Sequence, residues 1–355
     1  MEIPKLRIGS FTSDIPIVQG GMGVRVSLAS LASAVANEGG IGTISSIGLG
    51  DIEASKQEYE RESREALIKE IRKAKSKTTG HLAVNFMGVL SNVDDLIKTS
   101  VDEGVKMIVF GAGLPSRLPD LVHDPSVNLV PIISSARVAE LILRIWDKRF
   151  ERTADGLILE GPLAGGHLGF SEEQLKNPEE YSLEKLLPEV QECIKAFEDK
   201  YGRKIPVITG GGIYDGEDIA RMLSLGASGV QMGTRFVCTE ECGVSQEFKQ
   251  AYLDAKEEDI VIIKSPVGMP GRAIKNNFLK DLEIQGKMKI KCFYRCLTMC
   301  KIDEAQYCIA LALANSYFGD VEHGLIFCGQ NAYRINKIIT VRELIQELLS
   351  ELKAA

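Results

Sequence analysis

Short apolar runs alternate with amphipathic stretches over residues 16–240, usually with Gly, Ser or Asn at the junctions. The first apolar run, residues 16–19, predicts a strand that ends at the glycine-rich segment 20–23. A helix is predicted next, because the apolar residues from Leu28 to Val35 recur at i, i+3, i+4 and i+7. Seven more strands are predicted at residues 41–44, 82–85, 107–110, 129–133, 156–159, 206–209 and 229–232.

This alternation predicts the fold class. Strands that are apolar on both faces and separated by helices are typical of a parallel sheet covered by helices. Eight such units favour an α/β fold of the TIM (β/α)₈ barrel type. A doubly wound open sheet is the alternative.

The alternation stops after residue 240 and the pattern changes. Residues 241–290 contain Lys/Glu-rich helical stretches around the irregular segment 265–272, and residues 291–330 hold most of the cysteines. A last helix is indicated by an apolar stripe from Val341 to Leu352. We therefore expect residues 1–240 to form the barrel and residues 241–355 to form a C-terminal lid and cysteine-containing helical cap packed on it.

Composition narrows the classes of partner. Hydrophobic residues make up 45% of the chain and charged residues 26%, values of a globular protein with a large core. The net charge of −7, without a basic stripe, argues against nucleic acid or an anionic membrane as partner. No transmembrane run and no signal peptide is recognisable, so a cytoplasmic location and a small-molecule substrate are expected. The oligomeric state is left open, with a homodimer as one option.

Glycine-rich segments follow the seventh and eighth predicted strands. Phosphate sites of (β/α)₈ barrels often form from these two loops, where glycines let backbone N–H groups approach an anion. The alternative is that these glycines serve tight turns only. The candidate residues here are Gly210, Gly211, Gly212, Gln231, Met232, Gly233 and Thr234.

Other strand ends carry further candidates. The turn of Gly21, Met22 and Gly23 is open enough to lie against a planar ring, although a plain strand-to-helix turn explains it equally well. Asn85 offers an amide that could read the edge of a heterocycle, and otherwise acts as a local cap. Ser134 ends the fifth strand and has the same two interpretations, capping being favoured for Ser134 and Ser135.

The sixth unit contains the best catalytic candidate. Its strand ends at the carboxylate of Glu160, and a loop with Ala164, Gly165 and Gly166 then leads to His167. A histidine in a glycine-rich loop at the barrel mouth has little packing of its own, and its near-neutral pKa suits proton transfer. His167 is therefore predicted to be catalytic.

Together these segments resemble the FMN-dependent nitronate monooxygenase (2-nitropropane dioxygenase) family, which includes flavin-type enoyl-acyl-carrier-protein reductases. The resemblance covers roughly residues 10–280 and rests on the segments 19–23, 164–167, 209–213 and 231–234 together with Asn85 and residues 265–266. It implies a barrel that holds FMN non-covalently, with the Gly-Met turn facing the flavin ring. Gly211, Gly212, Gly233 and Thr234 would hold the phosphate. Asn85 and Glu160 would contact the ring and ribityl chain, and His167 would act as base or orient the substrate.

Two activities follow from this resemblance. The favoured one is oxidation of alkyl nitronates with dioxygen, as a nitronate monooxygenase. The alternative is an NAD(P)H-dependent enoyl-acyl-carrier-protein reductase, which the form of the segment 165–169 favours. A non-catalytic flavin-binding or partner-binding protein is a third reading, and His167 argues against it.

The eight cysteines are expected to be free thiols rather than a disulfide framework. Cys292, Cys296, Cys300 and Cys308 have the spacing C-x3-C-x3-C-x7-C. The first three could form one face of a helix and pack as small hydrophobic residues, which is the favoured interpretation. A metal or iron–sulfur site and redox-active thiols are the alternatives. We therefore assign no metal ligands from the sequence.

Overall fold

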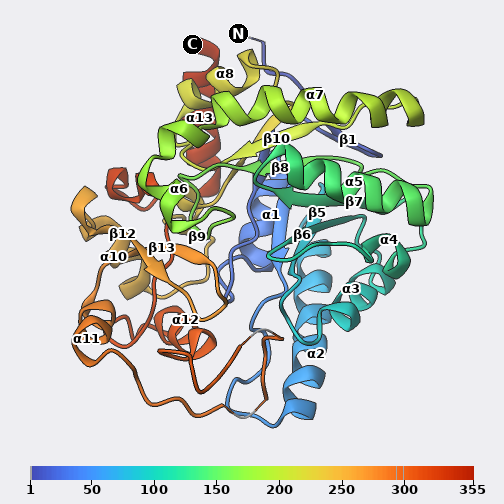
Figure 1. Ribbon diagram of the computed structural model, residues 1–355. Helices are drawn as coiled ribbons and strands as arrows, with labels where there is room; N and C mark the ends of the chain where they lie inside the picture. Colours follow the sequence, from blue (N-terminus) through green and yellow to red (C-terminus); the bar gives the residue numbers. More distant parts are fainter. Residues whose placement is uncertain (1, 293, 299) are drawn as a thin grey trace.

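The protein folds around a closed barrel of eight parallel strands (Figure 1). The computed structural model describes residues 2–292, 294–298 and 300–355. Around the ring the order is β3-β11-β10-β8-β7-β6-β5-β4, and hydrogen bonds join the two ends. Gln19 N–H donates to Ile41 O at 2.9 Å, and Ile41 N–H donates to Ile17 O at 3.0 Å. The strands are β3 (Ile17–Gln19), β4 (Gly42–Ser45), β5 (Leu82–Met87), β6 (Met107–Gly111), β7 (Asn128–Ile133), β8 (Leu157–Glu160), β10 (Val207–Gly210) and β11 (Gly229–Met232).

All eight predicted strands are present, and consecutive strands are neighbours. The predicted (β/α)₈ barrel is therefore confirmed. A doubly wound sheet would leave two free edges. Here a β-bridge between Val18 of β3 and Ile41, the residue before β4, closes the ring. Apolar strands form because both of their faces are buried, one against the barrel interior and one against the helices.

Helices surround the barrel, and the last helix of the chain is one of them. The Gly216 N–H at the start of α8 donates to Glu351 of α13 at 2.8 Å. Arg342, at the other end of α13, bonds Glu38 beside α1 at 2.8 Å. The predicted stripe from Val341 to Leu352 is buried in this position. The helices outside the cap are α1 (Ala29–Asn37), α2 (Lys56–Lys75), α3 (Val93–Asp102), α4 (Leu118–Leu121), α5 (Ala136–Phe150), α6 (Glu172–Lys176), η1 (Pro178–Tyr181), α7 (Leu183–Tyr201), α8 (Gly216–Ser224), α9 (Thr234–Val237) and α13 (Val341–Ala354).

Residues 341–354, which we expected in the cap, thus lie in the helical ring beside α8 (Figure 1). The reason is that residues 233–340 separate β11 from α13. The helix that completes the eighth β/α unit therefore comes at the end of the chain. The division of the chain after residue 240 stays a prediction.

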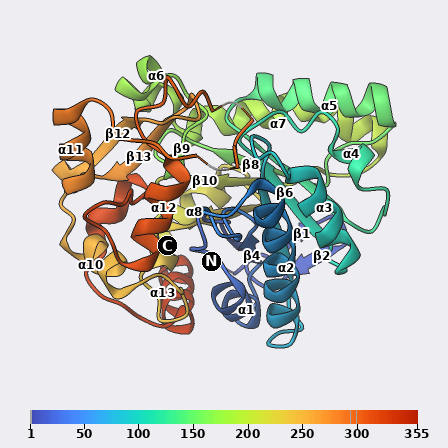
Figure 2. The same cartoon turned by 90° about the horizontal axis from the view of Figure 1, so that it is seen from below.

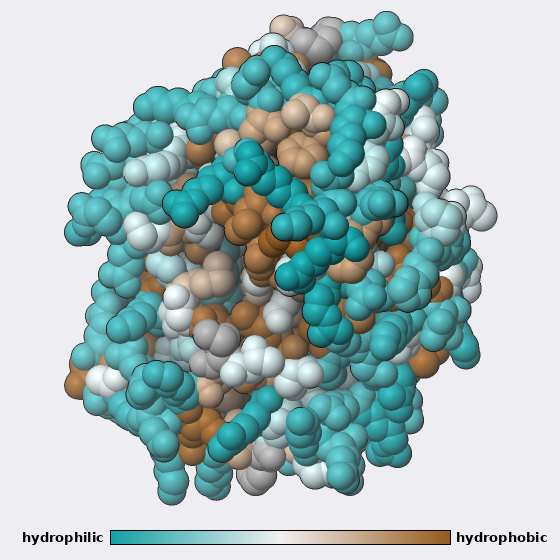
Figure 3. All heavy atoms as spheres, turned by 45° about the vertical axis from the view of Figure 1, so that its right-hand side comes forward, coloured by the Kyte–Doolittle hydropathy of each residue, from teal (hydrophilic) through white to brown (hydrophobic). Residues whose placement is uncertain are grey.

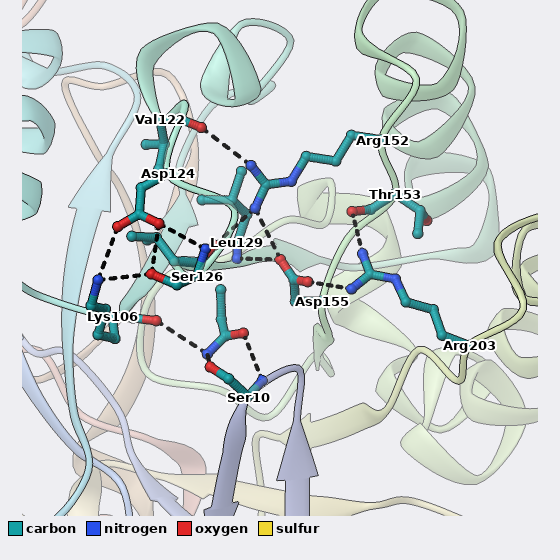
Figure 4. Close-up of polar contacts among 12 residues, drawn as sticks. Ser10, Lys106, Val122, Asp124, Ser126, Leu129, Arg152, Thr153, Asp155 and Arg203 are labelled. Carbon is teal, nitrogen blue, oxygen red and sulfur yellow. Dashed lines mark hydrogen bonds and ion pairs between the residues drawn. The ribbon is translucent and has the colours of Figure 1, made fainter.

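The N-terminal end of the barrel is sealed by a hairpin and a polar network. The hairpin of β1 (Leu6–Ile8) and β2 (Phe11–Ser13) packs its apolar side chains against the barrel interior. Asp155 precedes β8 and is almost fully buried. Its carboxylate accepts bonds from Arg203 at 2.6 Å, from Arg152 at 3.3 Å and from the Leu129 N–H at 2.8 Å (Figure 4). This end of the barrel is therefore built for stability and leaves the opposite end to carry a site.

A cap follows α9 and lies to one side of the barrel in both ribbon views (Figures 1 and 2). Its strand β13 pairs with β12 on one side and with the short strand β9 (Gly166–His167) on the other. The cap therefore adds a second sheet that incorporates the loop after β8. Its elements are α10 (Gln246–Asp254), η2 (Glu257–Asp259), β12 (Ile260–Lys264), β13 (Pro270–Ile274), α11 (Asn277–Gln285), α12 (Ile309–Phe318) and η3 (Gln330–Arg334).

The surface drawn in Figure 3 is mostly polar, and apolar side chains reach it mainly in a central hollow. Among the described residues, no helix has both the length and the apolar character needed to span a bilayer.

The cysteine-rich segment differs from its expected form. All eight cysteines are free, as predicted. However, the described residues between 286 and 308 contain no helix. The helical face that we expected for Cys292, Cys296 and Cys300 is therefore wrong. Instead, the Ser91 N–H donates to the Cys296 oxygen and the Thr298 N–H donates to the Val89 oxygen, which ties the segment to the loop after β5.

Candidate active site

A cavity opens at the carboxyl ends of the barrel strands, between the barrel and the cap. Ligands bind at this end of (β/α)₈ barrels. Glycine-rich loops line one part of the cavity, and cap residues line another. The sequence-predicted residues that line it are Gly21, Met22, Gly23, Asn85, Glu160, Ala164, Gly165, Gly166, His167, Gly211, Gly212, Gln231, Met232, Gly233 and Thr234.

The loops after β10 and β11 form one end of the cavity. Gly211 and Gly212 have φ values of +101° and +82°, which side chains rarely adopt. The backbone oxygen of Gly212 accepts a hydrogen bond from the Asn331 side chain at 2.7 Å. The Thr234 hydroxyl accepts one from the Gly329 N–H at 2.9 Å. Cap residues thus support both glycine loops from outside, and the turn into α9 follows the second loop.

The first glycine turn meets β5 at another part of the cavity lining. A Cβ on Gly21 would stand 2.2 Å from the Asn85 Cβ, so only glycine permits this approach. The Asn85 side chain is buried and lines the cavity. Within the described part of the chain its amide makes no hydrogen bond, which leaves it available to a ligand.

Glu160 ends β8 and faces the cavity beside Gln231. The Gln231 amide crosses over Gly210 and donates to the Glu160 carboxyl at 2.9 Å. A side chain at position 210 would crowd this crossing, because its Cβ would lie 3.4 Å from that of Gln231. Burial raises the pKa of Glu160 to about 7, and the bond from Gln231 opposes part of the rise. Glu160 is therefore partly protonated at neutral pH.

His167 is held by the cap rather than by the barrel. In strand β9 it pairs with Gly271 of β13, and its Nε2 lies 2.8 Å from the Ser265 hydroxyl. The Phe327 ring meets its imidazole edge-on, with centroids 5.0 Å apart. Burial lowers the pKa of His167 to about 4. The imidazole is therefore neutral at physiological pH.

A buried arginine fixes the loop that leads to His167. Arg272, next to Gly271 in β13, is 3% exposed. Its guanidinium donates to the backbone oxygens of Pro162, at 2.8 Å, and Ala164. Because these carbonyls would otherwise lack partners in a buried loop, Arg272 determines the path of the chain up to Gly165.

Two sequence candidates do not line the cavity. Gly210 lies within β10 and serves the crossing of Gln231 described above. Ser134 packs against Gly169, where an added Cβ would lie 2.8 Å from the serine oxygen. The next residue, Ser135, accepts a bond from the Val138 N–H and caps α5, as the capping interpretation predicts.

Several lining residues were not predicted from the sequence. They are apolar, and they come from the loops after β3 and β4, from the end of β5 and from the cap: Val24, Ile47, Met87, Leu313 and Phe327. Nothing local distinguishes them from ordinary core residues, because their role arises from segments far apart in the chain. No Lys or Arg side chain of the described residues lines the cavity.

A family model described as nitronate monooxygenase matches residues 5–351, nearly the whole chain. The chain belongs to this family. That membership confirms the resemblance seen in the sequence.

Relatives within and around the family differ in their described activities. The chain is 31% identical over 268 residues to a (3aS,4S,5R,7aS)-5-hydroxy-7a-methyl-1-oxo-octahydro-1H-indene-4-carboxyl-CoA dehydrogenase of Mycobacterium tuberculosis. That match covers 76% of this chain and 65% of the relative, so the chain spans less than two thirds of that protein.

Solved structures extend the likeness to the whole chain. FabK from Thermotoga maritima superposes with a TM-score of 0.73 at 28% identity, covering 96% of this chain and 94% of the other. Nitroalkane oxidase from Streptomyces ansochromogenes gives a TM-score of 0.74 at 22% identity, with 97% of each chain covered. At that identity the second likeness concerns the fold alone.

Proposed function

We propose that this protein is an FMN-dependent oxidoreductase that acts on an acyl thioester, reducing an enoyl group with electrons from NAD(P)H. The observation that carries this proposal is the charge of the cavity: its lining contains no Lys or Arg side chain and includes the apolar side chains of Ile47, Met87 and Leu313. Such a cavity suits an uncharged acyl chain better than a small anion.

The residues present fit FMN. Gly211, Gly212 and Thr234 offer a backbone cradle of the kind that binds phosphate, beside the turn into α9. The turn at Gly21, which carries no side chain, leaves room for a ring system, and the unpartnered Asn85 amide suits the edge of a heterocycle. FMN, when bound, would supply the capacity to accept and deliver a hydride.

Charge separates the two candidate substrates. A nitronate is an anion, and burying it without a cation nearby is costly. His167, with its pKa lowered to about 4, is neutral at pH 7, and Glu160 adds partial negative charge. By contrast, the apolar side chains of Ile47, Met87 and Leu313 would surround an acyl chain.

His167 and Ser265 would position the thioester. If Nε2 of His167 accepts a hydrogen bond from the Ser265 hydroxyl, the ring proton resides on Nδ1. The Nδ1–H group can then donate a hydrogen bond to a thioester carbonyl. Such a bond would favour charge on that oxygen while a hydride adds to the double bond. The dehydrogenase relative is named for a CoA thioester, which supports this substrate class.

Nitronate oxidation is the second candidate, favoured by the name of the matching family model. It requires that the substrate anion find its compensating charge elsewhere, for instance on a proton taken up by His167. The two activities differ in what reduces the flavin, and this difference can be measured.

The test is anaerobic mixing of FMN-loaded protein with NADH, with NADPH and with an alkyl nitronate, followed by flavin absorbance. We expect rapid bleaching by a nicotinamide, reoxidation on addition of a short enoyl-CoA, and little bleaching by nitronate. Bleaching by nitronate and not by either nicotinamide would replace the proposal with the second candidate. If the protein binds no FMN, both fail.

A histidine pair provides the control. His167→Ala should still be bleached by nicotinamide but should reoxidise slowly with enoyl-CoA. His323→Ala changes an exposed cap histidine that bonds Asp320, and it should behave like the unaltered protein.

A further inference from the structure

A cationic segment connects α11 to α12. Residues 284–302 contain no Asp or Glu, although acidic residues outnumber basic ones by 49 to 42 in the whole chain. Exposed acidic residues, including Asp281 and Asp303, precede and follow the segment. A run with one sign of charge raises the local concentration of counter-ions, so this segment favours an anionic partner. Its five cations are Lys287, Lys289, Lys291, Arg295 and Lys301.

Two of these cations already have partners in the cap. Lys287 donates to the backbone oxygen of Asp303 at 2.5 Å. Lys301 forms an ion pair with Glu304 at 3.1 Å. The other three side chains are exposed, and among the described residues they form no hydrogen bond or ion pair. These free cations are Lys289, Lys291 and Arg295.

The two free lysines lie on the outer side of their run. From residue 287 to residue 292, exposed lysines alternate with half-buried residues, as along a strand with one face packed. Met288 belongs to one apolar cluster with four side chains that line the cavity. Those four are Ile47, Met87, Leu313 and Phe327. The half-buried face thus packs beside the cavity wall and leaves the lysines on its outer rim.

Neighbouring contacts place Arg295 beside the loop after β5. Before it, the Tyr294 ring stacks on Tyr59 of α2 with centroids 3.8 Å apart. After it, Leu297 forms a β-bridge with Leu90, three residues beyond the end of β5. Figure 1 shows the same course, since the chain leaves α11 and reaches α2 before it returns to α12. Arg295 therefore also lies at the end of the barrel where the cavity opens.

Cationic charge is thus kept away from the reacting centre. No Lys or Arg side chain of the described residues lines the cavity that His167 faces, whereas three free cations lie outside its rim. A ligand that suits both places needs a long neutral arm between its reactive group and its anionic groups. A CoA thioester has this form, because pantetheine separates the acyl group from a pyrophosphate and a 3′-phosphate. A nicotinamide dinucleotide does not, because only one ribose separates its reacting ring from the first phosphate.

We propose that Lys289, Lys291 and Arg295 bind the phosphates of a CoA thioester at the rim of the cavity. Lysine and arginine form charge-assisted hydrogen bonds with phosphate oxygens. The inference rests on the proposed thioester function and narrows the carrier of the acyl group to CoA. An acidic carrier protein would need a docking surface of roughly 800 Å² and would then meet the exposed carboxylates of Asp281 and Asp303. The head of CoA is small enough to contact the cations alone.

The first experiment is calorimetric titration of the purified protein with CoA and with pantetheine, which lacks the phosphates. We expect CoA to bind about tenfold more tightly or better, and high salt to reduce this advantage because exposed charges are screened. The triple variant Lys289→Ala/Lys291→Ala/Arg295→Ala should lose the advantage. An affinity for CoA that is the same in the triple variant and in the unaltered protein would overturn the proposal.

A matched control removes the same charges at the other end of the barrel. Lys73→Ala/Lys148→Ala/Arg149→Ala alters exposed cations in the last turns of α2 and α5, where these helices reach the N-terminal end of the strands. This variant should bind CoA as the unaltered protein does. An equal loss in both triple variants would mean that net charge alone attracts CoA, and the assignment to the rim would be wrong.

The second experiment compares turnover of crotonyl-CoA and crotonyl-pantetheine by FMN-loaded protein. The preference for crotonyl-CoA, taken as the ratio of the two kcat/KM values, should fall about tenfold in the rim variant. A higher KM for NAD(P)H with an unchanged preference would assign the cations to the nicotinamide cofactor and overturn the proposal. A loss confined to an enoyl group on an acidic carrier protein would also overturn it. Because the titration needs no turnover, intact CoA binding without thioester reduction would refute the proposed function and not the CoA site.

Discussion

Glu160 offers a quantitative test of how the cavity is built. Its carboxyl has an ordinary pKa of 4.5, which burial raises to about 7 in the folded protein. At a pH between these two pKa values, the folded chain retains a proton on Glu160 that the unfolded chain has released. Stability must therefore fall as pH rises through this window, in proportion to the difference in bound protons. From pH 5 to pH 8 the loss from this group is about 2.5 kcal/mol, an upper figure because the carboxyl faces a cavity that water can enter.

The assay is urea unfolding of the flavin-free protein at pH 5, 6, 7 and 8, compared with Glu160→Gln. The neutral amide cannot ionise. The free energy of unfolding of the variant, relative to that of the unaltered protein, should therefore increase by roughly 2 kcal/mol between pH 5 and pH 8. Glu189→Gln, at an exposed position of α7, should show no such trend. The reasoning would be refuted if the difference in the free energy of unfolding between Glu160→Gln and the unaltered protein stayed constant with pH. The folded protein would then accommodate the ionised carboxylate without loss of stability.

Four further predictions concern the loops and the barrel base. His167→Ala should retain FMN but lower thioester turnover by about 100-fold or more; an unchanged rate would make this histidine structural. Gly212→Ala forces a side chain to φ +82° and should weaken FMN binding roughly 5- to 30-fold, measured by flavin fluorescence. The matched change Gly202→Ala, at φ +61° after α7 with open space around it, should lower stability but leave FMN affinity intact, and equal effects of the two would contradict a phosphate role. Ser265→Ala removes the bond to the imidazole, worth about 1 kcal/mol, so turnover should drop about fivefold and the acidic limb of its pH profile should move; no change in either would disconnect the serine from catalysis. Asp155→Asn should cost about 2–3 kcal/mol in urea unfolding because two arginines lose their shared carboxylate, the figure being reduced by the partial exposure of the Arg203 side chain; a loss below about 0.5 kcal/mol would contradict the network of Figure 4.

Local signals in the sequence were sufficient for the barrel. Each strand is largely buried on both faces, so its apolar run located it, and the apolar periodicity from Leu28 to Val35 located α1. The glycine loops after β10 and β11 were also recognisable, because both positive φ values and close backbone approach require glycine. Asn85 and Glu160 stood out as polar residues at the ends of apolar strands.

What the sequence left undecided depends on contacts between distant segments. The pairing of β9 with β13 attaches His167 to the cap and brings Ser265 to its ring, and no local pattern encodes a pairing across such a separation. The same holds for α13, whose amphipathic stripe predicted a helix but not its place beside α8.

The cysteine spacing shows the limit of periodicity most clearly. Residues at i, i+4 and i+8 indicate one face of a helix only if the segment is helical. Here the chain bonds to the loop after β5 instead, and the described residues between 286 and 308 are not helical. The sequence by itself determined the strands of the barrel, some of its helices and the glycine-lined end of the cavity, since each of these follows from burial or backbone conformation at neighbouring positions. Only the tertiary structure decided how the cap covers that cavity, because long-range pairing, shared burial and the resulting pKa values exist only once separate segments are in contact.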